Sequence, residues 1–339
     1  MTIFSSSKRK TLLMREHAKE TILQVQNLSV NLLYEGLPIK VVDDLSFDLH
    51  KGKTIAIVGE SGCGKSMTAL SIMRILPQPP VQQAEGKILY QGKDILSLKK
   101  NEMRKIRGSR IAMIFQDPMS ALNPVYTIGS QLLEVALLHM KLTENQAIKR
   151  ILESLKEVGI KDPERVALEY PHKLSGGMKQ RVMIAMALIC EPDILIADEP
   201  TTALDVTVQK QVLDLIKQLQ KRKGTALVLI THDMGVVAEM ADDVIVMYSS
   251  RSVEQGNVFD IFDNMLHPYT KGLFLSRPHC QKKAKKLYSI EGNVPSIAQR
   301  PKGCHFLPRC DQSIDPCRKG IAPNVKIHSS KHKVLCHLC

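Results

Sequence analysis

The chain has 339 residues, 44% of them hydrophobic and 4% aromatic, with no Trp, which suits one large or two modest domains with an aliphatic core. Its formal net charge of +13 favours an anionic partner such as a nucleotide, a nucleic acid or an anionic membrane face, although a solvated basic surface gives the same value. No apolar run is long enough to span a bilayer, and the polar, basic residues 1–19 lack the apolar middle of a secretion signal, so we expect a cytosolic protein.

The first predicted elements form a small sheet. After a basic N-terminal extension over residues 1–20, two segments, Ile22 to Leu33 and Val41 to Leu49, alternate loosely and contain several β-branched residues. We expect them to be two strands of an N-terminal antiparallel sheet. Tyr34 lies in the loop between them, where its ring could stack on an adenine base or serve as an ordinary amphipathic loop residue.

A glycine-rich stretch follows the third predicted strand and matches the phosphate-binding pattern G-x-x-x-x-G-K-S/T. The strand before it, Thr54 to Val58, is continuously apolar, and Met67 to Met73 is predicted to be the helix that opens on the loop. Glycines let backbone N–H groups approach phosphate oxygens, and the helix dipole adds positive potential. Lys65 would reach the β- and γ-phosphates, and the Ser66 hydroxyl would hold Mg²⁺. The residues expected to bind the nucleotide are Gly59, Glu60, Ser61, Gly62, Cys63, Gly64, Lys65, Ser66 and Met67.

A second candidate site residue stands at the end of a later strand. A short strand at Gly86 to Tyr90 and a basic helix at Ser97 to Arg107 precede the apolar strand Arg110 to Phe115. That strand ends at Gln116, beside the proline-bounded loop Asp117 to Pro124. Gln116 could sense Mg²⁺ and an attacking water, or it could be an ordinary polar strand end.

A block of helices is inserted next and should form a subdomain over about 117–180. The helical pattern runs from Ile128 to Arg165, with a capping box at Thr143 to Gln146 and Gly159 at the end of one helix. After it, Ser175-Gly176-Gly177 precede the helix Lys179 to Ile189 and make a second helix N-terminus able to bind phosphate.

Two carboxylates end the next apolar strand, which runs from Ile194 to Glu199. Open α/β sheets bind ligands at the carboxyl ends of their strands. Asp198 therefore suits a Mg²⁺ ligand, and Glu199 suits a general base for water.

The rest of the chain continues the alternation of helices and strands. His232 follows a core strand, which places it at the same sheet edge as Asp198 and Gln116 if the strands are parallel. The predicted elements are a helix with the apolar face Val208 to Leu219 that ends before Gly224, strands at Thr225 to Ile230 and Val244 to Met247, a helix at Thr270 to Ser276 and a basic linker at Arg277 to Lys286.

The order of these motifs resembles the ATP-binding subunits of ABC transporters over roughly Thr21 to Gly256. Leu174 to Met178 resembles the family signature, Asp198-Glu199 the Walker B end, Ala203-Leu204-Asp205 the D-loop and His232 the switch histidine. The resemblance implies a P-loop ABC ATPase of the α/β class, with a mostly parallel core sheet, an N-terminal antiparallel β subdomain, an inserted helical subdomain and a small cysteine-rich C-terminal extension.

The family also implies how the residues divide between two subunits that face each other head to tail. Lys65, Ser66, Gln116, Asp198, Glu199 and His232 would act on one ATP, with Ser66, Gln116 and Asp198 at its Mg²⁺. Ser175, Gly176 and Gly177 would complete the partner's site, and Asp205 would cross the dimer interface. Family members usually stack an aromatic ring on adenine; Tyr34 is the candidate, unless Ile39 occupies that place.

Further stretches resemble the dipeptide/oligopeptide importer branch, namely Gln116 to Pro124, the Gly176-Gly177-Met178 variant, His267 to Thr270 and Gly303 to Cys310. The branch implies an ATPase at the cytoplasmic face of the cell membrane that drives peptide import. Its partners would be a second homologous ATP-binding subunit, two transmembrane permease subunits and, indirectly, a solute-binding protein. We expect an ATP-binding domain over 21–276 and an importer-type extension over 277–339. Nickel importers are close relatives, so Ni²⁺ import is the alternative.

The cysteines crowd the end of the chain at Cys304, Cys310, Cys317, Cys336 and Cys339. The spacing of the first four resembles that of the importer branch, where it implies a 4Fe–4S cluster. The spacing itself shows only that several thiolates could converge, and four thiolates also suit tetrahedral Zn²⁺. A structural role is expected, because a small loop-rich tail needs a staple.

Two other functions fit part of the sequence pattern. A soluble ABC-type ATPase acting on DNA or ribosomes suits the positive charge, but the chain has neither the long coiled coil nor the repeated motifs of those relatives. An inactive scaffold subunit is disfavoured by Lys65 and the acid pair. We therefore expect no nucleic-acid partner.

Overall fold

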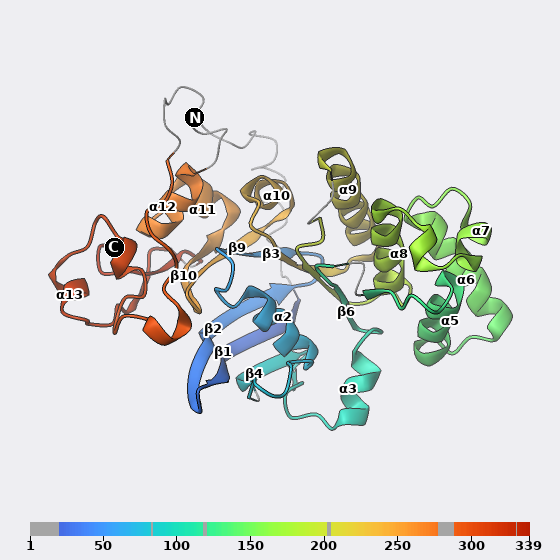
Figure 1. The fold of residues 1–339 in the computed structure, drawn as a ribbon, viewed down its shortest axis with the longest axis horizontal. Coiled ribbons are helices and arrows are strands. Elements are labelled where there is room, and N and C mark those ends of the chain that lie inside the picture. The colour runs from blue at the N-terminus through green and yellow to red at the C-terminus, as the bar shows by residue number, and fades with distance from the viewer. Residues whose placement is uncertain (1–19, 83, 118–120, 202–204, 277–287, 330) are drawn as a thin grey trace. The chain divides into compact units, whose positions relative to one another are not determined.

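The structure is a computed structural model, and it describes residues 20–82, 84–117, 121–201, 205–276, 288–329 and 331–339 (Figure 1). The chain divides into two compact units. Unit 1 contains Met1–Leu49, Thr54–Leu96 and Ile230–Cys339, and unit 2 contains His50–Lys53 and Ser97–Leu229. The predicted N-terminal extension up to residue 19, residues 118–120 of the proline-bounded loop and the predicted linker lie outside the described residues.

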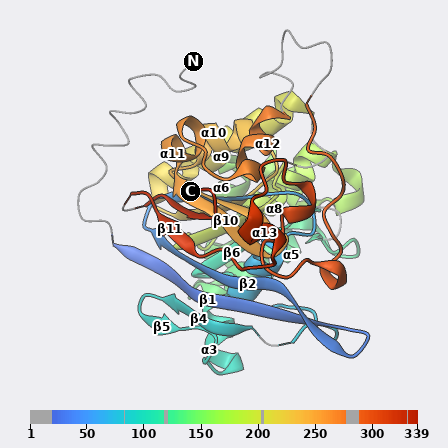
Figure 2. The same ribbon diagram turned by 90° about the vertical axis from the view of Figure 1, so that its left-hand side faces the viewer.

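Unit 1 begins with an antiparallel sheet in the order β2-β1-β4-β5. Its strands are β1 (Thr21–Tyr34), β2 (Leu37–His50), β4 (Glu85–Tyr90) and β5 (Lys93–Asp94), which lie side by side in Figure 2. Glu35 and Gly36, with φ of 50° and 78°, make the two-residue turn between β1 and β2. Such turns match the twist of paired strands, so both strands extend further than predicted. The N-terminal antiparallel sheet is confirmed.

A second set of strands in unit 1 has the order β11-β12-β10-β9-β3. The central pair, β3 (Thr54–Val58) and β9 (Asp243–Tyr248), is parallel, with Ile55 opposite Asp243. The other strands, β10 (Arg251–Asn257), β12 (Lys333–Leu335) and β11 (Val325–Ile327), are added antiparallel. None of these last three strands was predicted, because β10 is largely polar and β11 and β12 have three residues each.

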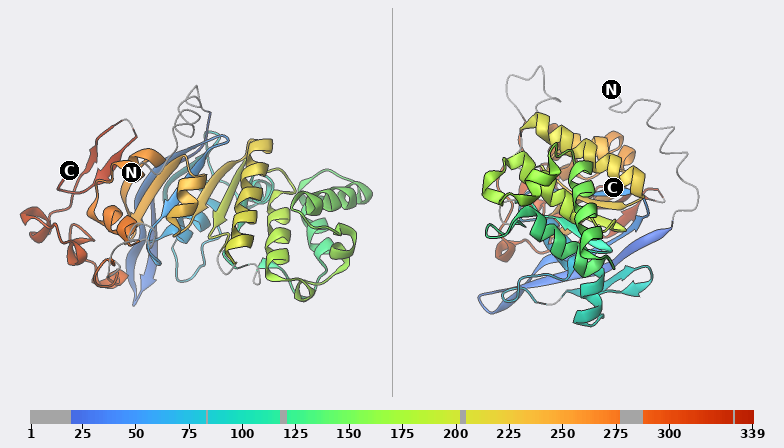
Figure 3. Two further views of the ribbon diagram at one scale, coloured as in Figure 1. Left: turned by 90° about the horizontal axis from the view of Figure 1, so that it is seen from above. Right: turned by 90° about the vertical axis from the view of Figure 1, so that its right-hand side faces the viewer.

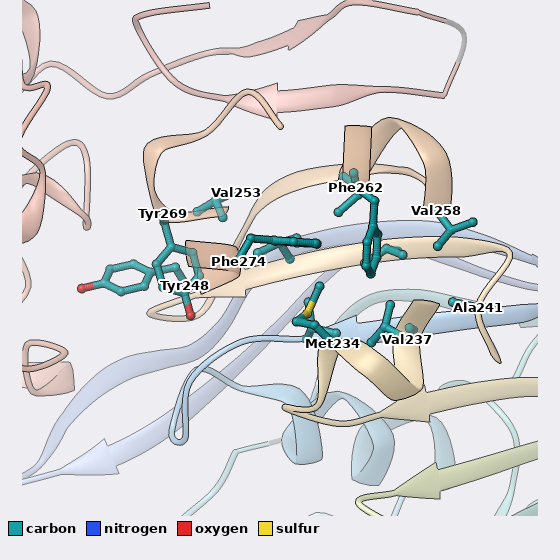
Figure 4. Packing of buried hydrophobic residues seen from close by; sticks show 14 of the residues in the cluster. Met234, Val237, Ala241, Tyr248, Val253, Val258, Phe262, Tyr269 and Phe274 are labelled. Carbon is teal, nitrogen blue, oxygen red and sulfur yellow. The ribbon is translucent and has the colours of Figure 1, made fainter. Parts of the chain in front are cut away.

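The helices of unit 1 include α2 (Lys65–Met73), α10 (Met234–Met240), α11 (Val258–Asp263), α12 (Pro268–Leu275) and α13 (Asp315–Arg318). Three of them, α10, α11 and α12, pack with β9 around one apolar cluster (Figure 4). Its aromatic side chains meet in pairs: the ring centroids of Phe262 and Phe274 lie 4.5 Å apart, and those of Tyr248 and Tyr269 lie 4.7 Å apart. The first pair joins α11 to α12, and the second joins β9 to α12.

Unit 2 has strands in the order β8-β7-β6, namely β8 (Ala226–Ile230), β7 (Ile194–Asp198) and β6 (Ile111–Ile114). Strands β6 and β7 are parallel, with Ile114 opposite Ala197. The predicted helical block is present as α5 (Ile128–His139), α6 (Glu144–Glu157) and α7 (Pro163–Leu168), drawn in green in Figure 3. The unit also contains α3 (Lys100–Ile106), α8 (Gly176–Leu188) and α9 (Val206–Lys223).

Predicted caps set several of these helix ends. Thr143 and Gln146 form the capping box of α6, and Gly159 follows its C-cap with a φ of 80°. Gly224 ends α9 in the left-handed region, which favours glycine because it has no Cβ atom. Local sequence therefore fixed where these helices begin and end.

Candidate functional site

The glycine-rich loop of unit 1 joins the end of β3 to the start of α2, as predicted. A Cβ atom on Gly59 would lie 2.1 Å from the Met247 carbonyl oxygen, and one on Gly64 would lie 2.4 Å from the Val41 carbonyl oxygen. Both residues also have positive φ. The loop therefore packs its backbone directly against neighbouring backbone, and only glycine permits that approach.

Lys65 is the first residue of α2 and is 6% exposed. Its ammonium group donates hydrogen bonds to the carbonyl oxygens of Gly59, at 2.8 Å, and Glu60, at 3.0 Å. The side chain thus curls back over the loop that would hold phosphate. Ser66 follows it and is partly buried, and the first turn of α2 has no acidic residue to weaken the positive end of the helix.

The loop backbone has two further contacts inside unit 1. The Glu60 N–H donates to the Tyr269 hydroxyl at 3.0 Å, and the Cys63 carbonyl accepts from the Ser250 N–H at 3.1 Å. Burial raises the pKa of the Cys63 thiol, opposed by the charge of Lys65. Cys63 is therefore a packed thiol.

Gln116 and Glu199 meet in unit 2. Gln116 follows β6 and Glu199 follows β7, and because these strands are parallel both residues lie at the same edge. The Gln116 side-chain amide donates to a Glu199 carboxylate oxygen at 2.9 Å. Glu199 has a φ of 46°, which is uncommon for a residue with a side chain and is a kind of strain found at functional sites. Asp198, the last residue of β7, is 5% exposed.

The signature stretch forms the N-terminus of α8 in unit 2. The Ser175 hydroxyl caps the helix by accepting from the Met178 N–H. Ser175 and Gly176 are exposed, and a Cβ atom on Gly176 would meet nothing within 4 Å. Gly177 is closer to its surroundings, since its Cβ would lie 3.3 Å from Val208. The first residues of this helix are therefore accessible to solvent.

Asp205 and His232 occupy helix starts in different units. In unit 2, the Asp205 carboxylate caps α9 by accepting from the N–H groups of Thr207 and Val208. Ala203 and Leu204 of the predicted D-loop lie outside the described residues. In unit 1, His232 is exposed just before α10, next to Thr231, whose N–H donates to the Ile57 carbonyl oxygen of β3. His232 thus lies in the same unit as the glycine-rich loop.

Comparisons with known proteins agree with the family that the motifs predict. Residues 42–202 match the family model "ABC transporter", and residues 253–317 match "Oligopeptide/dipeptide transporter, C-terminal region". The dipeptide transport ATP-binding protein DppD of Bacillus subtilis is 50% identical, over 94% of this chain and 95% of its own length. This chain belongs to the oligopeptide/dipeptide branch of the ABC transporter ATP-binding proteins. AppD of Bacillus subtilis, an oligopeptide transport ATP-binding protein, is 48% identical over 94% of this chain and 97% of its own.

Solved structures confirm the predicted fold class. The ATP-binding cassette MJ0796, in a dimeric post-hydrolysis state bound to ADP and Pi, has a TM-score of 0.63 at 27% identity over 70% of this chain and 99% of that chain. CbiO1 from Clostridium perfringens, part of an ABC transporter complex, has a TM-score of 0.61 at 32% identity over 73% of this chain and 92% of that chain.

Membership of this family makes the chain an ATPase whose hydrolysis of ATP, with Mg²⁺, is coupled to transport. ABC importer subunits of this kind dimerise and work with membrane permeases. Within the residues that the structure describes, none of the helices combines the length and apolar character needed to cross a membrane.

The adenine-stacking candidate of this ABC protein is Tyr34, which ends β1 and is 50% exposed beside the Glu35-Gly36 turn. Ile39, the alternative, is partly buried in β2. An exposed ring on a hairpin end is available for stacking, so Tyr34 remains the prediction.

The C-terminal cysteines influence one another's pKa values. Burial raises the pKa of Cys304, and the thiols of Cys317 and Cys336 add to the rise. Burial likewise raises the pKa of Cys310 to about 11, with Cys304 and Cys336 contributing. Among the described residues, however, no group of three or more His, Cys, Asp or Glu is arranged to hold a metal ion. The structure therefore does not support the predicted iron–sulfur or zinc site.

Proposed function

We propose that this chain is the ATP-hydrolysing subunit of a membrane importer for dipeptides and oligopeptides. The observation that carries the proposal is the match of residues 253–317 to the C-terminal region of oligopeptide/dipeptide transporters, together with similarity to DppD over nearly the whole chain. The ATP-binding domain would span 21–276, with the helical subdomain over about 117–180, and the importer-type extension 277–339.

In the proposed hydrolysis, Glu199 positions or deprotonates the attacking water. The hydrogen bond from Gln116 supports this role, since it holds one Glu199 oxygen and orients the carboxylate. Lys65 and the loop N–H groups stabilise the charge on the transferring phosphoryl group, and His232 contacts the γ-phosphate.

Mg²⁺ is the metal that this family implies, and oxygen donors suit it. The Ser66 hydroxyl, the buried Asp198 carboxylate and the Gln116 amide oxygen are the oxygens proposed to hold it. When bound, Mg²⁺ supplies positive charge beside the phosphate oxygens.

The proposed functional state is a dimer that closes on ATP. Ser175, Gly176 and Gly177 would complete the nucleotide site of the partner subunit, and Asp205 would cross the interface. The exposure of Ser175 and Gly176 at the start of α8 supports this role, because a helix N-terminus that solvent reaches can bind a phosphate group. ATP would favour the closed dimer, and hydrolysis with release would reopen it. The dimeric form of the similar MJ0796 also supports this arrangement.

The proposed partners are a second homologous ATP-binding subunit, two permease subunits and, indirectly, a solute-binding protein. Such an assembly places the chain at the cytoplasmic face of the cell membrane as a peripheral subunit. Selection of the peptide would then lie in the permeases and the binding protein, outside this chain.

Uptake by cells that lack this gene tests the proposal. Cells restored with the wild-type chain or with Lys65→Ala are offered labelled dipeptides, longer peptides and Ni²⁺ in parallel. We expect peptide uptake only with the wild-type chain, because Lys65→Ala removes the cation that holds the phosphates. Loss and rescue of Ni²⁺ uptake alone would move the substrate to nickel, and no transport defect would contradict a transport role.

A four-cysteine site at Cys304, Cys310, Cys317 and Cys336 is a separate proposal, and it rests on the spacing of these cysteines and on the importer-branch match, which contains the first three of them. Iron, acid-labile sulfide and zinc are measured in full-length protein purified anaerobically. Iron with sulfide supports the 4Fe–4S cluster, zinc alone supports the tetrahedral site, and the absence of both rejects the proposal. The peptide-import proposal is independent of this result.

A further inference from the structure

The C-terminal extension reaches the phosphate loop inside unit 1. Arg309 follows Cys304 and precedes Cys310 in the sequence. Its Nη1 atom donates to both carboxylate oxygens of Glu60, at 3.1 and 2.9 Å. Glu60 is the first residue after Gly59 in the loop, at a position where the phosphate-binding pattern accepts any residue. The ion pair therefore joins the extension to the loop through a residue whose type the phosphate-binding pattern does not specify.

Arg309 is itself held in place from three sides. Its side chain is only 5% exposed. The Nε atom donates to the Glu291 carbonyl oxygen at 3.0 Å, and Nη2 donates to the Ile290 carbonyl oxygen at 3.3 Å. The guanidinium carbon also lies 5.8 Å from the centre of the Tyr248 ring, within cation–π range. Because each nitrogen has a partner, the guanidinium is a rigid anchor for Glu60, which a lysine could not reproduce.

A second contact holds the same loop residue through its backbone. The Tyr269 hydroxyl accepts from the Glu60 N–H at 3.0 Å, and Tyr269 is fully buried. Its ring packs on Tyr248 of β9, beside which it lies in Figure 4, and on Phe306 of the extension, with ring centroids 4.7 and 5.5 Å away. The extension thus supports Tyr269 as well as supplying Arg309.

The extension also contacts the turn between β9 and β10, and this turn in turn contacts the phosphate loop at Cys63. His305 makes a 2.8 Å hydrogen bond to the Ser249 carbonyl oxygen, and the neighbouring Ser250 N–H donates to the Cys63 carbonyl. Lys65 in turn donates to the carbonyl oxygens of Gly59 and Glu60. A shift of Glu60 would therefore move the anchor of the lysine that is expected to bind phosphate.

We propose that Arg309 and Tyr269 are positioning residues for the phosphate loop, so that the C-terminal extension sets how tightly this chain binds nucleotide. This inference rests on the ATPase function. Neither residue touches the reacting atoms, and both act through Glu60. If the extension only stabilised the fold, these contacts could be removed without changing nucleotide affinity as long as the chain stayed folded.

The test is the dissociation constant of the purified full-length chain for ADP with Mg²⁺, measured by calorimetry so that hydrolysis does not interfere. We expect Arg309→Met and Glu60→Gln each to weaken binding about tenfold, which corresponds to about 1.4 kcal/mol. The double variant should be little worse than either single one, because both remove the same ion pair. Arg309→Lys should restore only part of the affinity, since it keeps the charge and loses the fork.

Arg318→Met is the matched control. Arg318 is an exposed arginine of the same extension, and its side chain bonds to Ser313. It should keep wild-type affinity. Tyr269→Phe removes only the hydroxyl and keeps the ring packing, so it tests the second contact if Arg309→Met fails to fold. Wild-type affinity in folded Arg309→Met and Tyr269→Phe would overturn the inference and leave the ATPase intact. A wild-type chain that binds no nucleotide would instead contradict the proposed function.

Discussion

Glu254 of β10 is a buried carboxylate on which α12 depends, and its removal should loosen that helix. Glu254 is 1% exposed and accepts from the N–H groups of Leu266 and His267, at 2.9 and 3.0 Å. Its Oε1 atom also lies 2.8 Å from the His332 ring nitrogen before β12. Glu254→Ala leaves these groups without their acceptor, and an orphaned buried donor costs about 1–3 kcal/mol. We expect a loss of about 3 kcal/mol or more.

Hydrogen exchange followed by mass spectrometry measures this loss locally, which matters because two units need not unfold together. A loss of about 3 kcal/mol should raise the exchange rate of peptides spanning 258–276 by roughly two orders of magnitude. Glu153→Ala, at an exposed position of α6, is the control and should leave those peptides unchanged. Unaltered protection of 258–276 in Glu254→Ala would refute the role assigned to the buried carboxylate.

Two further predictions concern the loop and the start of α12. Gly59→Ala should abolish ADP binding, because its Cβ would lie 2.1 Å from the Met247 carbonyl oxygen. Gly92→Ala is the control and should keep ADP binding, because Gly92 also has positive φ but a Cβ there would meet nothing within 4 Å. Equal affinities of the two variants for ADP would contradict the packing argument. Burial, aided by the Lys271 charge, lowers the pKa of His267 to about 3, so the unfolded chain takes up a proton near pH 6.5 that the folded chain refuses. The free energy of unfolding should therefore fall with acidification between pH 6.5 and 3 by up to about 1.4 kcal/mol per pH unit. His267→Asn keeps a capping side chain and should show a shallower fall when urea unfolding is measured across this pH range. Parallel pH profiles of the two proteins would rule out His267 as the origin of the pH dependence.

Much of the nucleotide site could be predicted because its signals are local. The glycines of the phosphate loop and the capping box at Thr143 act on backbone a few residues away, so their pattern is visible in a short window. The acid pair at the end of β7 could be predicted because a run of apolar residues ends there. The placement of Gln116 and Asp198 at one sheet edge was predicted from the expectation that their strands are parallel, which the register of β6 and β7 confirms. The hydrogen bond from Gln116 to Glu199 was not predicted.

The features that sequence reasoning missed depend on contacts between distant residues. Arg309 and Glu60 are 249 positions apart, and the sequence around each residue gives no signal of a contact with the other. Strand β10 is largely polar and strands β11 and β12 have only three residues each, so none of them gives a clear strand pattern in the sequence. Asp205 is different: an Asp directly before a helix is a capping signal, and this role could have been predicted beside the interface role.

The most direct test of the central claim is dipeptide uptake by cells in which Glu199→Gln replaces the wild-type chain, with ATP retention by the purified variant measured alongside. Gln keeps an oxygen that can accept from the Gln116 amide, so the site should stay assembled while the general base is lost. We predict that the variant retains ATP and that its cells take up no labelled dipeptide. Uptake at the wild-type rate would contradict the claim that ATP hydrolysis at Glu199 drives peptide import.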